Sequence, residues 1–367
     1  MPTAHEKEKM VSQKLKCLGK EVNEMIDKKQ GPFIELPVRT LTNVYFDPKS
    51  QTIKLGEKTS QRQFLNIAHT RKFMQTVLVA SEINKLVEEK VNVSIRDLYY
   101  ALKHTIEGTN ENTFEEQSES DPVIEDLEAS IDLLREELHL TATSKGIIVG
   151  DMKIKDGKDT IDLNKMGSGG WGVPSNVEPD RIEIKDLSAD YILFIEKDAV
   201  WKRFNEDGYW KKNKCIIITG KGQPARAERR LVQRLNHEFK LPVYALMDAD
   251  PWGMYIYSVI KQGSISLSYS EEKLATPATQ YLGLTTKDVD TFKIPKEVTI
   301  KLTQLDIKRI NEMKSYEWFK KKPWQEEFDR MKEKNYKLEL EALSRKGIRF
   351  ITQTYVPQKI ESKDFLP

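Results

Sequence analysis

The stretch Ser94-Ile-Arg-Asp-Leu-Tyr-Tyr-Ala-Leu-Lys-His-Thr105 predicts a short helix with reactive side chains on its solvent face. Ser94 and Asp97 form a capping box, because an N-cap serine and an acid at the third helical position bond to each other's backbone. At about 100° per residue, the aliphatic side chains of this helix fall on one side. The polar side holds Arg96, Tyr100, Lys103 and His104. The hydroxyl of Tyr100 is therefore expected to point away from the core.

Tyr100 is a candidate nucleophile, since Arg96 and His104 lie one helical turn to either side of it and both attract phosphate. A second interpretation is open at this point. A tyrosine on an amphipathic helix commonly packs half-buried, with its hydroxyl bonded to water or backbone. A phenol, with a pKa of about 10, is also a weak nucleophile until a cation or base activates it. A catalytic role for Tyr100 therefore requires an activating group elsewhere in the chain.

The residues before this helix predict a helix-turn-helix. Apolar residues at helical spacing run from Arg62 to Lys90, and the three residues Val91–Val93 form a tight turn. In a helix-turn-helix the second helix enters the major groove of DNA. Two short apolar segments, Gly146–Val149 and Met152–Ile154, are expected to form the strands of a wing. These features predict a winged-helix domain that binds double-stranded DNA.

The N-terminal segment and the middle of the chain are expected to frame this domain. Residues 5–28 carry a narrow apolar stripe at helical spacing, and Val44–Phe46 and Thr52–Leu55 predict a hairpin. The run Gly167-Ser-Gly-Gly-Trp-Gly172 matches a GxGxxG pattern, but Pro174 opposes the helix that a dinucleotide site needs. An ordered glycine-rich linker is therefore expected here.

After residue 190 the pattern changes to continuous apolar strands that alternate with helices. The strands are expected at Tyr191–Ile195, Cys215–Thr219 and Val243–Met247. This alternation is typical of a parallel sheet covered by helices on both faces. Nearer the C-terminus we expect a strand at Lys296–Leu302 and a final strand at Phe350–Val356.

Three acids follow these strands. Glu196 ends the first strand, and Asp248 and Asp250 end the third. Because the carboxyl ends of parallel strands share one edge of a sheet, these side chains are expected to converge there. Acids at strand ends are also common as solvated turn residues, so the pattern alone leaves both interpretations open. Three carboxylates with open coordination positions suit Mg²⁺.

A magnesium ion at these acids would supply the activation that Tyr100 lacks. A bound metal lowers the pKa of an attacking oxygen and stabilises charge on phosphate. Arg96 can hold the same phosphate with its planar guanidinium. Three further cations are expected to contact nucleic acid: Lys103, His104 and Lys221.

Composition sets further bounds on the function. The 367 residues contain 59 Lys and Arg against 57 Asp and Glu, so any DNA-binding surface must come from local segregation of charge. Cys17 and Cys215 are far apart and lack zinc-ligand spacing. The chain has no GxxxxGK[ST] motif for ATP and no apolar stretch near 18 residues. We expect a cytoplasmic, nucleoid-associated protein without a membrane segment.

Five motifs together resemble the A-subunit family of archaeal DNA topoisomerase VI, which includes the meiotic recombination endonucleases. The motifs are Arg96-Asp-Leu-Tyr-Tyr100, Gly169-Gly-Trp-Gly-Val-Pro-Ser175, Phe194-Ile-Glu-Lys-Asp198, Thr219-Gly-Lys-Gly-Gln-Pro224 and Asp248-Ala-Asp-Pro-Trp-Gly253. The resemblance runs from about residue 30 to residue 360. It implies that Tyr100 is the nucleophile and that Glu196, Asp248 and Asp250 belong to a Toprim fold. The fold class that we predict is therefore a multidomain protein with α/β and α+β parts, in which a winged-helix domain precedes a Toprim domain.

The predicted domain layout follows from this resemblance. Residues 1–68 form an N-terminal helix and hairpin segment, residues 69–160 the winged-helix domain, residues 161–180 the linker, and residues 181–367 the Toprim domain with a C-terminal extension. The resemblance also implies a homodimer of A subunits joined to an ATPase B subunit in an A₂B₂ heterotetramer. Tyr100 of one protomer would meet the acids of its partner. The N-terminal helix is a candidate contact for the B subunit, because nothing in the sequence covers its apolar stripe.

Two other functions remain open from the sequence. In a Toprim nuclease or primase, the acids and metal would activate water, and Tyr100 would have no chemical role. A winged-helix regulator with a degenerate Toprim domain would bind DNA without cleaving it. Covalent protein–DNA adducts distinguish the topoisomerase from both alternatives.

Overall fold

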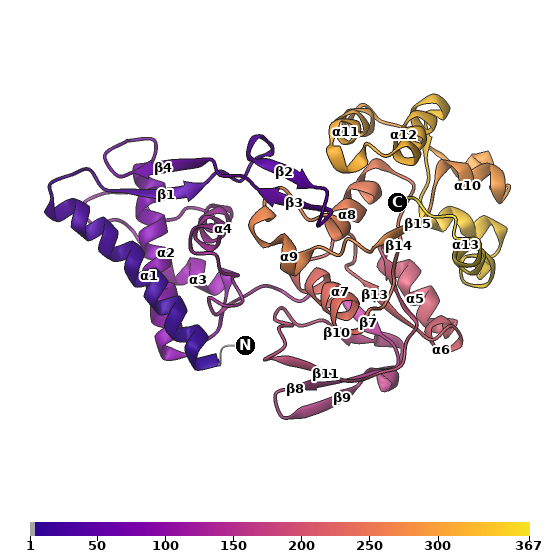
Figure 1. Cartoon of the computed structure of the whole chain (residues 1–367), viewed down its shortest axis with the longest axis horizontal. Helices are drawn as coiled ribbons and strands as arrows, with labels where there is room; N and C mark the ends of the chain where they lie inside the picture. Colours follow the sequence, from indigo (N-terminus) through magenta and orange to yellow (C-terminus); the bar gives the residue numbers. More distant parts are fainter. Residues whose placement is uncertain (1–3) are drawn as a thin grey trace. The chain divides into compact units, whose positions relative to one another are not determined.

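The structure is a computed structural model that describes residues 4–367, with side chains from Glu6 onward. The chain divides into two compact units, which we describe separately. Unit 1 comprises residues 4–45, 54–143 and 265–270, and unit 2 comprises residues 46–53, 144–264 and 271–367. Figure 1 colours both units along the chain.

Unit 1 is built mainly from helices. Its helices are α1 (Ala4–Asp27), α2 (Thr70–Glu89), α3 (Ile95–Leu102) and α4 (Ser120–Ile131). Its strands are β1 (Phe33–Pro37), β4 (Thr59–Gln63), β5 (Val93–Ser94) and β6 (Leu140–Thr141). Between β1 and β4 the chain forms the hairpin β2 (Val44–Asp47) and β3 (Thr52–Leu55), which the sequence predicted and whose residues 46–53 belong to unit 2. Strands β1 and β4 are antiparallel, and β5 pairs with β6 in parallel.

The long N-terminal helix confirms the helical prediction, but the middle of its apolar stripe is covered. Val11 and Leu15 of α1 are buried in one cluster with Val79 and Ile83 of α2. Figure 1 shows α1 lying along α2. The stripe therefore packs on the chain's own second helix, which removes the argument for assigning it to a B subunit.

Helix α2 begins later than the sequence predicted. Helical spacing suggested a start at Arg62, but residues 59–63 form β4 and pair in register with β1. Leu65 and Ile67 then lie exposed in the turn before Thr70. Pairing with a neighbouring strand, which local spacing does not reveal, decided this boundary.

Unit 2 is centred on a six-stranded sheet in the order β10-β7-β13-β12-β14-β15. Its strands are β7 (Ile147–Val149), β10 (Trp171–Gly172), β12 (Tyr191–Ile195), β13 (Cys215–Thr219), β14 (Val243–Leu246) and β15 (Gln280–Gly283). Strands β13, β12, β14 and β15 are parallel, as the apolar runs predicted for the first three. Strand β15 was missed, and β7 joins the sheet antiparallel to β13.

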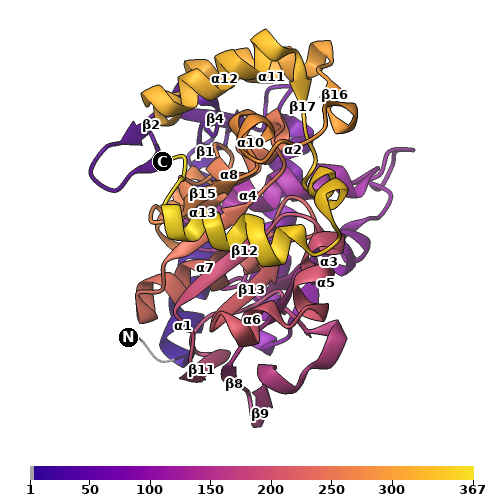
Figure 2. The ribbon, with the colours of Figure 1, turned by 90° about the vertical axis from the view of Figure 1, so that its right-hand side faces the viewer.

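Helices cover both faces of this sheet (Figures 1 and 2). Alternate residues of the strands, such as Leu193, Ile195 and Ile217, pack with Trp201 of α5 in one cluster. The helices of unit 2 are α5 (Asp198–Glu206), α6 (Tyr209–Lys212), α7 (Arg226–Phe239), α8 (Pro251–Lys261), α9 (Glu271–Leu274), α10 (Thr286–Thr291), α11 (Gln304–Ser315), α12 (Lys322–Lys334) and α13 (Val356–Ser362).

The predicted wing strands exist but form no wing. Strand β7 belongs to the six-stranded sheet. The second predicted strand, β8 (Met152–Asp156), pairs with β9 (Asp159–Asp162) and β11 (Ile182–Leu187) in a separate three-stranded sheet. Apolar and polar residues alternate in the strands of a wing and in the strands of these sheets alike. The sequence pattern therefore does not distinguish a wing from these sheets. The predicted linker also contains β10, which pairs with β7.

The C-terminal prediction needs two corrections. Residues 350–356 form no strand, because Ile351–Tyr355 is helical and continues into α13. Ile351, Thr352, Tyr355 and Val356 are the buried residues there, and this spacing puts them on one helical face. The strand expected at Lys296–Leu302 is reduced to β16 (Ile300–Lys301), which pairs with β17 (Tyr336–Lys337).

Candidate active site

Helix α3 presents Tyr100 to solvent as the sequence predicted. The capping box is formed, with Ser94 Oγ accepting from the Asp97 N–H at 3.0 Å and Asp97 Oδ2 accepting from the Ser94 N–H at 3.3 Å. Tyr100 is 60% exposed, whereas the adjacent Tyr99 is 6% exposed. The amphipathic turn thus separates the two tyrosines, and only Tyr100 offers its hydroxyl to a bulky substrate.

The cations near Tyr100 have different surroundings. The guanidinium carbon of Arg96 lies 5.9 Å from the centre of the Tyr100 ring. Lys103 Nζ donates to the hydroxyl of Tyr99 at 3.0 Å and to the carbonyl of Glu115 at 2.7 Å. Arg96 and His104 are exposed. Arg96 is therefore the cation beside Tyr100, while Lys103 holds the hydroxyl of the buried Tyr99.

The acids lie where the strand order of the sheet reverses. Strand β12 has β13 on one side and β14 on the other, so the chain crosses over β12 between its second and third parallel strands. Glu196 follows β12, and Asp248 and Asp250 follow β14. Ligands of open α/β sheets bind at such a switch point, outside the carboxyl ends of the strands.

The three carboxylates converge on the start of α8. Glu196 Oε2 accepts from the backbone N–H of Asp248 at 3.0 Å, and Asp250 Oδ1 caps α8 by accepting from Gly253 N–H at 2.6 Å. A Cβ on Gly253 would lie 3.0 Å from Glu196 Oε2, 3.2 Å from Asp250 Oδ1 and 2.8 Å from the Asp248 carbonyl. Position 253 therefore has no room for a side chain among these three oxygens.

Burial makes the charged forms of these acids costly. Burial, and next the charge of the neighbouring Asp248, raise the pKa of Glu196 to about 8. Burial raises the pKa of Asp248 to about 6, although the Leu340 N–H and Lys197 oppose the shift. The pKa of Asp250 is raised for the same reason. Carboxyl groups crowded in this way bind a cation readily, because a cation offsets both desolvation and mutual repulsion.

The turn that carries Lys221 lies next to this edge. Gly222 N–H donates to the carbonyl of Glu196 at 2.8 Å, and Lys221 itself has a left-handed φ of 54° and an exposed side chain. The structure therefore groups Lys221 with the acids of unit 2. Tyr100, Arg96, Lys103 and His104 are grouped in unit 1.

Sequence comparisons match three family profiles to this chain. Two are described as "Type IIB DNA topoisomerase" (residues 71–140) and "All-beta domain in DNA topoisomerase VI alpha subunit" (145–188). The third describes the Toprim domain that the A subunit of topoisomerase 6 shares with Spo11 (191–360). The A subunit of type 2 DNA topoisomerase 6 from Pyrococcus abyssi is 44% identical, over 97% of this chain and 95% of its own. The chain belongs to the topoisomerase VI A-subunit family.

Other members of the topoisomerase VI A-subunit family show the same breadth of similarity. The A subunit from Hyperthermus butylicus is 45% identical over 95% of this chain and 93% of its own length. The A subunit of DNA topoisomerase 6 from Arabidopsis thaliana is 35% identical over 92% of this chain and 77% of its own. The resemblance inferred from the five motifs is thus confirmed over nearly the whole chain.

The Toprim profile covers the acid edge of unit 2, and a Toprim domain indicates binding of a divalent metal. The donors fit such an ion, since hard divalent cations prefer carboxylate oxygens. Among residues 6–367, no group of three or more His, Cys, Asp or Glu side chains is arranged to coordinate a metal ion. Lys197 Nζ instead lies 3.0 Å from Asp248 Oδ2, so an ammonium group is the cation at this edge.

Sequence reasoning missed the residues that surround this ammonium group. Lys197 also contacts Glu339 Oε2 at 3.1 Å and Glu341 Oε2 at 2.8 Å, and the Leu340 N–H donates to Asp248 Oδ1 at 2.7 Å. A signal was present, because the acids alternate with buried leucines in the stretch Leu338–Glu341. This alternation indicates that both acids are exposed, although Leu340–Lys346 forms a 3-10 helix and not an extended strand.

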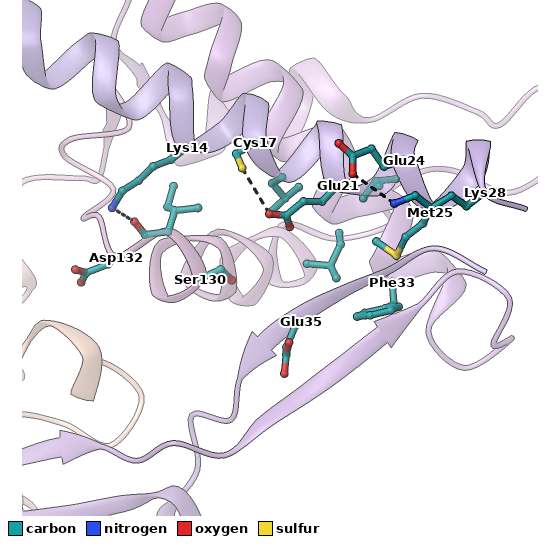
Figure 3. Close-up of a pocket in the computed structure, with 14 residues that line it drawn as sticks. Lys14, Cys17, Glu21, Glu24, Met25, Lys28, Phe33, Glu35, Ser130 and Asp132 are labelled. Carbon is teal, nitrogen blue, oxygen red and sulfur yellow. Dashed lines mark hydrogen bonds and ion pairs between the residues drawn. The ribbon is translucent and has the colours of Figure 1, made fainter. Parts of the chain in front are cut away.

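A separate cavity of unit 1 contains none of the predicted site residues. It has a volume of about 600 Å³ and opens between α1, β1 and the end of α4 (Figure 3). Cys17 and Glu21 of α1 lie on one side of the cavity, and Phe33 and Glu35 of β1 lie on the other.

The described helices include none with the length and apolarity that a membrane span requires.

Proposed function

We propose that this chain is the DNA-cleaving subunit of its topoisomerase, with Tyr100 as the nucleophile. The hydroxyl oxygen of Tyr100 forms a bond to a backbone phosphorus, and the bond from that phosphorus to the 3′ oxygen breaks. The products are a 5′-phosphotyrosyl link and a free 3′-hydroxyl. One phosphoester replaces another, so the hydroxyl can reverse the reaction and reseal the strand. The exposure of Tyr100 beside Arg96 is the observation that carries this proposal.

The other side chains of the site divide the remaining tasks. Arg96 holds the attacked phosphate with its planar guanidinium and stabilises the charge that develops on it. Glu196, Asp248 and Asp250 would hold Mg²⁺, which when bound stabilises negative charge on the phosphate and leaving oxygens. Lys221 and His104, whose side chains are exposed, would contact the DNA backbone, and Lys103 would act through the hydroxyl of Tyr99.

Membership of the topoisomerase VI A-subunit family supports the partners that we propose. Double-stranded DNA is the substrate, and two A subunits together cut both strands. A separate B subunit supplies ATP hydrolysis, so that the A₂B₂ heterotetramer passes one duplex through another and relaxes and decatenates DNA. The missing GxxxxGK[ST] motif supports this division of labour. We assign no surface of unit 1 to the B subunit.

The nucleophile of one protomer would act with the acids of the other. Tyr100 and the acids lie on separate compact units, so a dimer can combine them across its interface. Each of the two sites then cuts one strand, and a double-strand break requires both.

A denaturing gel tests the proposal directly. Protein, supercoiled DNA and Mg²⁺ are incubated with and without the B subunit, and the reaction is stopped with detergent. We expect protein-linked DNA ends that disappear when Tyr100 is replaced by phenylalanine. Cleaved DNA without linked protein would instead support the metal-dependent nuclease. DNA binding without any cleavage, even with the B subunit, would support the non-catalytic alternative.

A further inference from the structure

Lys197, which directly follows the proposed metal ligand Glu196, places its ammonium group among several carboxylates. Its ammonium group contacts three carboxylates, from Asp248, Glu339 and Glu341, at 3.0, 3.1 and 2.8 Å. An ammonium group has three N–H donors and no acceptor, so these contacts use its full capacity. The side chain is 24% exposed, which places it at the rim of the acid edge.

Asp248 has both carboxylate oxygens engaged in this arrangement. Its Oδ1 accepts from the Leu340 backbone N–H, and its Oδ2 faces the ammonium group. The first bond is fixed by the backbone, since the Leu338 N–H also donates to the carbonyl of Ala249 at 3.0 Å. Asp248 Oδ2 is therefore the oxygen available to coordinate a metal ion. For this, only the Lys197 side chain must move away.

The two glutamates can keep the ammonium group once it leaves Asp248. Leu338 and Leu340 are buried, whereas Glu339 directly precedes the 3-10 helix Leu340–Lys346 and Glu341 lies in its first turn, and both carboxylates reach Lys197. Both glutamate side chains are about half exposed, so their rotation costs little packing.

We propose that Lys197 is an exchangeable counter-cation of this site, which neutralises Asp248 in the metal-free protein and is transferred to Glu339 and Glu341 when a divalent cation binds. Lys197 is thus a positioning residue that sets the affinity of the metal centre. This inference rests on the metal centre of the proposed function. It assigns a role to three residues that lie outside the Glu196, Asp248 and Asp250 set.

The test measures Mn²⁺ binding to the purified full-length chain by electron paramagnetic resonance, without DNA or turnover. Lys197→Gln removes the competing cation, and we expect Mn²⁺ to bind about tenfold more tightly. The variant should fold, because Lys197 lies at the N-cap of α5 without a side-chain capping bond. Binding within about threefold of wild type would overturn the exchange.

Lys337→Gln is the matched control. Lys337 also carries a charge that lowers the pKa of Asp250, but its ammonium group pairs with Asp306 at 3.0 Å. If general electrostatics explained the effect, both variants would tighten Mn²⁺ binding similarly, which would contradict our proposal. We expect Lys337→Gln to change the affinity by less than about threefold.

A second variant keeps Lys197 and removes its alternative partners. Glu339→Gln combined with Glu341→Gln should weaken Mn²⁺ binding, because the displaced ammonium group has no other acceptor. In the Lys197→Gln background the same pair should have a much smaller effect. Equal effects in the two backgrounds would show that the glutamates act on the metal directly and would overturn the exchange.

Two further outcomes separate this inference from the metal centre itself. If Asp248→Asn and Glu196→Gln bind Mn²⁺ as wild type does, the proposed centre is wrong and the exchange is wrong with it. If both variants lose binding while Lys197→Gln does not tighten it, only the exchange is wrong. The exchange would also be wrong if the Lys197→Gln chain bound two Mn²⁺ ions and wild type bound one. The ammonium group would then occupy the position of a second metal ion.

Discussion

Tyr100 in unit 1 is 60% exposed on a two-turn helix, whereas Glu196 in unit 2 is 8% exposed at the end of a central strand. The tyrosine depends on its immediate neighbours in sequence, with Arg96 one turn away. Glu196 depends on Asp248, 52 positions later in the sequence, because its carboxylate accepts a hydrogen bond from the Asp248 backbone N–H. The Tyr100 hydroxyl is thus accessible to a large substrate, while Glu196 lies in a buried edge of the sheet that disfavours its charged form.

This contrast separates two ways to disable the protein. If the proposed function is right, loss of the exposed Tyr100 hydroxyl abolishes DNA cleavage without disturbing packing. A change in the buried acids alters chemistry and pH-dependent stability together, because their burial links the two.

The largest effect is expected for Tyr100→Phe. Removing one exposed oxygen should lower DNA cleavage by at least about 10³-fold, since no other group can form the covalent link. DNA affinity, measured by fluorescence anisotropy, should stay within about twofold because almost no surface is lost.

Tyr99→Phe is the matched control for that variant. It removes the hydroxyl bonds to the Glu115 carbonyl and Lys103, so it should cost about 1 kcal/mol of stability and leave cleavage within a few fold. An essential Tyr99 together with a dispensable Tyr100 would contradict the assignment of the nucleophile.

Isosteric changes of the acids test the buried side of the comparison. Glu196→Gln and Asp250→Asn keep their acceptors for the Asp248 and Gly253 N–H groups but lose charge. Cleavage should fall by about 10²-fold or more, and added Mg²⁺ should restore it only in part. DNA binding should be unchanged or tighter. A large loss of DNA affinity would show that these acids have a structural role instead.

Mixed dimers test whether the two regions act across the protomer interface. One chain carries Tyr100→Phe and the other Glu196→Gln, each with a different affinity tag. If the site is shared, one site collects both defects and the other keeps both groups, so the dimer should nick one strand. If each site forms within one chain, neither site is intact. Absence of nicking, where wild type cleaves, would rule out the shared site.

The smallest effect concerns pH. The pKa of Glu196 is raised in the folded protein to about 8 from its usual 4.5. Between these values the native state binds more protons than the unfolded state, so the free energy of unfolding falls as pH rises from about 5 to about 8. The slope contributed by this group is at most about 1.4 kcal/mol per pH unit.

Urea denaturation of the metal-free protein across this range measures the effect. Glu196→Gln should flatten the dependence above pH 6, where Asp248, with a pKa of about 6, contributes less. The exposed Glu297→Gln should leave it unchanged. An equally steep decline in Glu196→Gln would contradict the burial-driven shift.

Local sequence was sufficient for the nucleophile region. The capping box and the helical spacing of residues 94–105 fixed α3 and chose Tyr100 over Tyr99, because a short capped helix depends on contacts within one or two turns. The apolar runs also fixed β12, β13 and β14, since buried parallel strands leave a continuous hydrophobic pattern.

Tertiary structure decided what sequence patterns leave ambiguous. The residues of β7 and β8 have the pattern of a wing, but strand pairing assigns them to two sheets of unit 2. Asp248, Glu339 and Glu341 meet at Lys197 because the chain returns to the sheet edge at Leu340, 92 positions after Asp248. Local propensity can specify a helix and the face it exposes. Which distant strand supplies a hydrogen bond, or which lysine neutralises a buried acid, depends on packing between segments that the sequence does not place side by side.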